Sequence, residues 1–158
     1  IGLIAGNLVN VYSDNAGKDG WEKITLASTI GGMVINTAGV TLAHGMEHPA
    51  SGLRDIVHGK GLAALTPAII EASYTGNESK FADIAKLFGG KEAKDLALKI
   101  RELLKSINLN CTLSDLGIEE KDIPWMAENC MKVSAASVAN NPVVFTQEQI
   151  ADIYKKAL

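Results

Sequence analysis

The chain contains only three histidines, His44, His48 and His58, and all of them fall within one fifteen-residue stretch. Imidazole is the commonest neutral metal ligand and titrates close to neutral pH, so the cluster could bind a divalent metal or transfer protons. His44 and His48 are four residues apart, which places both rings on one face of a helix. The spacing predicts a site in which His58 joins the other two from the start of a following helix.

Two nearby carboxylates could add to such a ligand set. Glu47 points about 100° away from His48 on the same helix, which makes it a poor partner. Asp55 lies in the expected loop between the two helices and is the better candidate. Pro49 disfavours helical geometry at His48 and predicts that the helix ends there. Catalytic metal sites commonly have three protein ligands, so we expect further ligands from outside this chain.

A structural interpretation of the three histidines stays open beside the catalytic one. A histidine on an apolar helix face is often a core residue whose hydrogen bonds are satisfied. The chain would then be a non-catalytic helical packing or interaction domain without metal affinity. Substituting His44 or His58 would in that case cost only ordinary packing energy.

The composition is typical of one globular domain with a sizeable core. The chain has 158 residues, of which 47% are hydrophobic, too many for a disordered segment. A net charge of −3 without a basic run argues against nucleic acid as a partner. Cys111 and Cys130 form no paired motif and predict a reducing, cytoplasmic location without disulfides.

The chain opens on Ile1 within an apolar stretch, without a basic leader or a cleavage pattern for a signal peptide. This stretch is too short to span a membrane, and we expect no membrane partner. A helix that begins without a polar lead-in predicts that residues 1–158 are a fragment of a longer protein. Apolar surface left uncovered there predicts self-association, so we expect a homo-oligomer.

Apolar residues recur at helical spacing along almost the whole chain, and no segment alternates as a strand does. The fold class is therefore all-α. The pattern predicts helices over residues 1–12, 21–34, 36–47, 59–74, 78–88, 91–107, 119–133 and 147–157. Gly31 and Gly32 weaken the end of the second helix, and Thr146 with Gln149 forms a capping-box pattern before the last. No strand leads into a glycine-rich turn, so the chain alone should bind no nucleotide.

Residues 39–67 resemble the signature of the iron-containing (group III) alcohol dehydrogenases. The segment holds H-x-x-x-H from His44 to His48, nine intervening residues, then His-Gly, and a helix that carries Leu-x-Pro. The later segments LSDLGIEEKDIPWMAENC and FTQEQIADIYKKAL resemble the same family. The chain departs from the family at Val57, where proline is common, and at Asn140-Asn141-Pro142-Val143, where Asn-Pro-Arg is common.

The resemblance implies a two-domain enzyme on the scaffold that dehydroquinate synthase also uses. Its N-terminal α/β domain binds NAD or NADP, and its helical, bundle-like C-terminal domain binds Fe(II), sometimes replaced by Zn(II). Residues 1–158 correspond to the helical domain, without the cofactor domain and without an Asp-x-x-x-His pair that supplies two metal ligands. His44 and His58 match the other two ligands. His48 matches a histidine near the substrate that assists proton movement.

The implied reaction interconverts a small-molecule alcohol and its aldehyde. The metal lowers the pKa of the alcohol, and the nicotinamide takes the hydride. The chain by itself is expected to be inactive, because it lacks the cofactor domain and two ligands. A glycerol dehydrogenase or an enzyme like dehydroquinate synthase is the alternative, but the H-x-x-x-H and His-Gly pattern favours the alcohol dehydrogenases.

Overall fold

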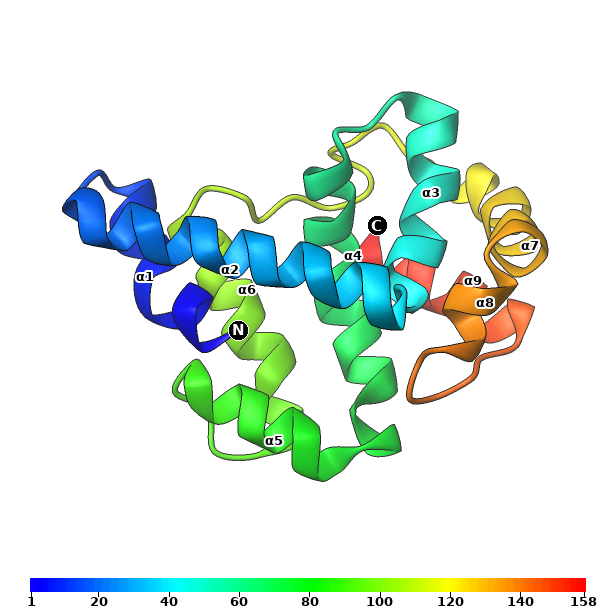
Figure 1. Ribbon diagram of the computed structural model, residues 1–158. Coiled ribbons are helices and arrows are strands. Elements are labelled where there is room, and N and C mark those ends of the chain that lie inside the picture. The colour runs from blue at the N-terminus through cyan, green and yellow to red at the C-terminus, as the bar shows by residue number, and fades with distance from the viewer.

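The computed structural model describes residues 1–158 and contains helices without strands, which confirms the all-α class (Figure 1). The α-helices are α1 Gly2–Tyr12, α2 Gly17–Ala38, α3 Leu42–Arg54, α4 His58–Ser73, α5 Glu78–Leu87, α6 Leu96–Ser106, α7 Ile123–Val133, α8 Ala135–Ala139 and α9 Gln147–Ala157. Short 3-10 helices, η1 Tyr74–Gly76, η2 Ala93–Asp95 and η3 Glu120–Asp122, precede α5, α6 and α7. The helix α8 was not predicted.

The core lies where α3 and α4 meet α7 and α9. α3 packs against α4, α7 and α8, while α4 also packs against α6 and α9. Figure 1 shows α3 and α4 side by side, joined by a short loop at one end. The fully buried side chains at this junction include Leu42, Met46, Leu65, Met126, Ile150 and Tyr154. The helix that carries His44 and His48 is therefore anchored along its inner face.

The N-terminal helices α1 and α2 form a hairpin beside this core. α2 runs unbroken through Gly31 and Gly32, so the prediction that a helix ends there was wrong. Each glycine weakens a helix by only about 1 kcal/mol. The chain breaks instead at Gly39, whose φ of 73° suits glycine better than any other residue. No single helix is long and apolar enough to cross a membrane, and α2 with α3 reaches that length only as a pair bent by 99°.

α2 buries only Gly20 within the chain. Its exposed large apolar side chains are Trp21, Leu26, Ile30, Met33, Val34 and Ile35. Apolar patches of this kind commonly mark surfaces that pack against another protein or domain.

α3 continues through Pro49 to Arg54, so the prediction that the helix ends at His48 was wrong. A proline inside a helix removes one hydrogen bond, here the one that the carbonyl of Gly45 would accept. Burial of Pro49 and Ala50 against the core offsets that loss. The helix ends at Asp55 in the left-handed conformation, with a φ of 51°.

The predicted helix starts near the C-terminus agree with the structure. Thr146 and Gln149 form a reciprocal capping box, in which each backbone N–H donates to the other side chain at 2.9 and 3.3 Å. The predicted helices over 91–107 and 119–133 each open with a 3-10 turn. Cys111 and Cys130 are free, as predicted.

Tyr154 of α9 ties the end of the chain to the histidine helix. Its side chain is fully buried, and its hydroxyl donates to the carbonyl oxygen of Met46 at 2.5 Å. Burial raises the pKa of this hydroxyl well above its ordinary value, so it stays protonated as a donor.

We predict that Tyr154→Phe lowers the free energy of unfolding by about 0.5–1.5 kcal/mol, the usual net contribution of one such hydrogen bond. Urea denaturation followed by circular dichroism measures the change, with Tyr12→Phe as the control, because the Tyr12 side chain is exposed and its hydroxyl accepts only an exposed hydrogen bond from Asn108. Equal stability of Tyr154→Phe and the unsubstituted chain would show that the bond does not hold α9 to α3.

Candidate metal centre

The corner between α3 and α4 brings the three histidine rings together. His44 and His48 project from successive turns of α3, and His58 is the first residue of α4. The ring centroids lie 5.2 Å apart for His44 and His58, 6.0 Å for His48 and His58, and 6.2 Å for His44 and His48. The predicted cluster therefore forms, although His48 lies in the middle of its helix and not at its C-terminus.

The ring spacing distinguishes one pair from the other two. Two imidazoles that bind one ion tetrahedrally through nitrogen, at ~2.0–2.1 Å, have centroids about 5 Å apart. His44 and His58 have this separation, whereas His48 stands farther from both. The pair of His44 and His58 thus fits a shared ion, and His48 fits a position beside it.

The chain by itself offers no complete ligand set. No three His, Cys, Asp or Glu side chains lie together so that they could hold one ion. Asp55 is exposed and serves as the residue that ends α3, so it does not complete a set with His44 and His58. The chemistry of the pair still suits a divalent transition metal, since neutral imidazole is a good ligand for iron and zinc.

A buried carboxylate stands behind His58. Glu47 is 0% exposed, and its Oε2 lies 2.6 Å from Nδ1 of His58. Its Oε1 accepts a hydrogen bond from the hydroxyl of Ser51, one turn later on α3. When the sequence alone is considered, Glu47 can be compared only with His48 on the same helix, where it is a poor partner. The contact with His58 was missed because it joins two helices.

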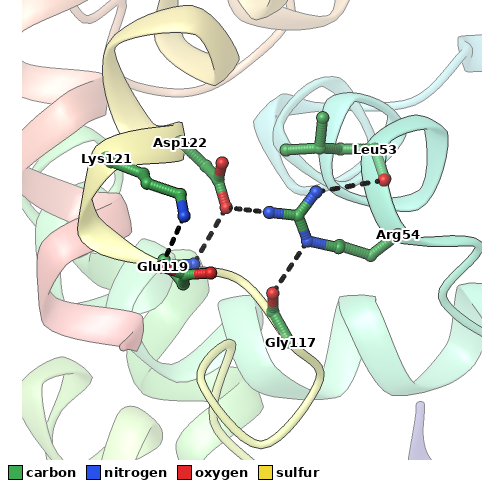
Figure 2. Close-up of polar contacts among 6 residues, drawn as sticks. All are labelled: Leu53, Arg54, Gly117, Glu119, Lys121 and Asp122. Atoms are coloured by element: carbon green, nitrogen blue, oxygen red, sulfur yellow. Dashed lines mark hydrogen bonds and ion pairs between the residues drawn. The ribbon is translucent and has the colours of Figure 1, made fainter.

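Arg54 fixes the end of α3 just before the loop that leads to His58. Figure 2 shows its guanidinium between two acceptors from another part of the chain. Its Nε donates to the carbonyl of Gly117 at 2.9 Å, and a terminal nitrogen lies 2.7 Å from Asp122 Oδ2. Asp122 also caps η3 by accepting from the backbone N–H of Glu119 at 3.0 Å. This ion pair joins the C-terminal end of α3 to η3, immediately before α7.

The surroundings of His44 lower its pKa below the ordinary value. Partial burial lowers the pKa of His44, and repulsion from His58 and His48 lowers it further, while Glu47 opposes the shift. A lowered pKa keeps the ring neutral near pH 7. A neutral ring has the free lone pair that metal binding requires.

Comparison with known proteins finds relatives over essentially the whole chain. Residues 1–158 match the Fe-containing alcohol dehydrogenase family, C-terminal. The 1,3-propanediol dehydrogenase of Klebsiella pneumoniae is 35% identical over 99% of this chain and 42% of its own length. The chain thus spans less than half the length of this relative.

Two solved structures show the same fold. A 1,3-propanediol oxidoreductase has a TM-score of 0.89 at 34% identity, covering 99% of this chain and 43% of its own. An NADH-dependent butanol dehydrogenase A from Thermotoga maritima has a TM-score of 0.81 at 26% identity, covering 99% and 44%. The fold is therefore that of the C-terminal part of these dehydrogenases.

We predict that His44 in the metal-free chain titrates below the ordinary value of 6.5. Because its pKa is lower in the folded than in the unfolded state, the unfolded chain binds the proton more tightly. The contribution of His44 to stability is complete above about pH 6.5 and is lost as the pH falls from there through the folded pKa. Ring chemical shifts in an NMR titration measure the pKa, and urea denaturation between pH 5 and 8 measures the stability.

The variant His44→Gln serves as the control for that pH dependence. It should lose the part of the stability change below pH 6.5 that belongs to His44. A His44 pKa equal to or above that of an exposed histidine would contradict the prediction.

Proposed function

The chain belongs to the iron-containing alcohol dehydrogenase family, and we propose that it is the metal-binding helical domain of an enzyme that interconverts a small alcohol and its aldehyde. The family match over residues 1–158 and relatives named for propanediol and butanol support this substrate class. The cofactor is NAD or NADP. One structural neighbour is named as NADH-dependent, which supports a nicotinamide cofactor.

His44 and His58 are proposed as metal ligands, and the spacing of their rings is the observation that carries the proposal. Their centroids are 5.2 Å apart, whereas those of His48 lie at 6.0 and 6.2 Å from the pair. His44 is held neutral by its lowered pKa. We propose Fe(II) as the metal, with Zn(II) as the substitute, because two imidazoles suit both ions.

His48 is proposed as the residue that moves the proton. A divalent ion at this site supplies a Lewis acid that makes the alcohol proton easier to remove. The ring of His48 is exposed on the same face of α3, beside the two proposed ligands. A histidine in this position can accept the alcohol proton and pass it to water, since imidazole both accepts and donates protons through its two ring nitrogens.

The other parts of the enzyme lie outside this chain in our proposal. The chain spans 42% of the length of its propanediol dehydrogenase relative, which leaves room for a cofactor domain. That domain would supply the remaining ligands, the Asp-x-x-x-His pair, and would bind the nicotinamide. The exposed apolar side chains of α2 suit contact with this domain or with a second subunit of a homo-oligomer. Two free cysteines support a reducing, cytoplasmic location.

We predict that the chain retains Zn(II) or, without oxygen, Fe(II) through His44 and His58. His44→Ala and His58→Ala should each weaken Zn(II) binding at least about 10-fold, since each removes one of two ligands. His48→Ala should bind as the unsubstituted chain does. Competition with a chromophoric zinc indicator measures the affinity, and circular dichroism checks the fold of each variant. Equal binding by all four proteins would favour the structural interpretation of the histidines.

We predict that the 158-residue chain alone does not reduce NAD or NADP with any alcohol, whereas the full-length protein does. In the full-length protein, His48→Ala should lower kcat by roughly 10²–10⁴-fold, the range for loss of a general acid or base. Its metal content should not change. Turnover by the isolated chain, or a His48→Ala enzyme with normal kcat, would contradict these roles.

A further inference from the structure

The carboxylate of Glu47 is the one fully buried charged group of the chain, and it lies against a proposed metal ligand. A carboxylate removed from water is costly unless hydrogen bonds satisfy its oxygens. Here each oxygen has one partner: Oε2 the Nδ1 of His58 at 2.6 Å, and Oε1 the hydroxyl of Ser51. The group is therefore held in one orientation by two residues on either side of the α3–α4 loop.

The contact on Nδ1 determines which nitrogen of His58 is free. An ionised carboxylate only accepts hydrogen bonds, so Nδ1 of His58 must carry the proton that it donates. A neutral ring then has its lone pair on Nε2, on the opposite side from the buried carboxylate. The His58 side chain is 52% exposed, while that of Glu47 is 0% exposed, so Nε2 lies toward the open side of the ring.

Close packing keeps Glu47 in this position. A Cβ added at Gly61, on the first turns of α4, would lie 2.8 Å from both Cγ and Oε1 of Glu47. Real Cβ atoms essentially never show contacts of that length, so a side chain at position 61 would force the buried Glu47 side chain to shift. Gly61 therefore leaves the room that the carboxylate occupies.

We propose that Glu47 is a positioning residue that holds His58 in its Nδ1–H tautomer, so that Nε2 is presented to the metal. The proposal rests on the assignment of His58 as a ligand. Carboxylates that accept from the second nitrogen of a metal-binding histidine orient the ring and strengthen its basicity. Ser51 assists by holding the other oxygen of the carboxylate, and Gly61 by leaving it space.

The first experiment observes the ring in the metal-free chain. Long-range ¹H–¹⁵N NMR spectra above pH 7.5 distinguish a protonated Nδ1 from a protonated Nε2. The unsubstituted chain should show His58 with the proton on Nδ1. Glu47→Met, which has a similar volume and no acceptor, should release the ring to a mixture of tautomers. A predominant Nε2–H form in the unsubstituted chain would overturn the proposal.

The second experiment measures Zn(II) affinity by competition with a chromophoric indicator. Glu47→Met should weaken binding by about 10–100-fold, the usual effect of removing such a partner. Gly61→Ala should also weaken binding, although it alters neither the carboxylate nor any histidine. Gly59→Ala is the matched control, since a Cβ there meets nothing within 4 Å. Tyr154→Phe controls for loss of stability alone, and both controls should bind as the unsubstituted chain does.

The two experiments separate this proposal from the proposed function. Zn(II) binding that depends on His44 and His58 but not on Glu47 would overturn the positioning role and leave the ligands assigned. Zn(II) binding that depends on neither histidine would overturn the ligand assignment and, with it, the positioning role. Loss of affinity in Gly59→Ala equal to that in Gly61→Ala would also count against it.

Discussion

Burying an ionised carboxylate is costly unless its oxygens accept hydrogen bonds, and one such buried group lies at the corner between α3 and α4. Glu47 is fully buried, and its partners come from the next turn of its own helix and from the first residue of α4. The loop of residues 55–57 must therefore bring His58 back to α3 within hydrogen-bond distance. The same contact favours glycine at position 61, since a Cβ there would lie 2.8 Å from the Glu47 side chain and would force it to shift. One polar group thus sets the approach of two helices.

Contacts with other parts of the chain hold α3 at its middle and at its end. Tyr154 holds the middle of α3 from α9, and Arg54 holds its end through Gly117 and Asp122. A close approach at Gly45, where a Cβ would lie 3.2 Å from Ser134 Cβ, sets α3 against the α7–α8 junction. The contacts at Gly45 and Met46 lie on the buried face of α3, whereas Arg54 acts at the exposed end of the helix.

Buried and exposed apolar side chains lie in different parts of the molecule. The core lies among α3, α4, α7 and α9, whereas α2 exposes a row of large apolar side chains. No three His, Cys, Asp or Glu side chains of the chain lie so that they could bind one ion. Both features agree with membership in a family whose proteins are longer than this chain, such as the propanediol dehydrogenase that it covers to 42%.

The sequence by itself determined the features that depend on neighbours along the chain. The spacing of His44, His48 and His58, the capping pattern of Thr146 and the apolar periodicity all act within a few residues, so the helices and the family resemblance could be predicted. Pro49 and Gly31 led to wrong predictions of helix ends, because burial and helix length outweighed the tendency of proline and glycine to interrupt a helix. Only the tertiary structure decided that Glu47 faces His58 and that His44 stands nearer to His58 than His48 does. Those relations depend on how α4 returns against α3, and the angle and depth of that return arise from contacts between residues far apart in sequence.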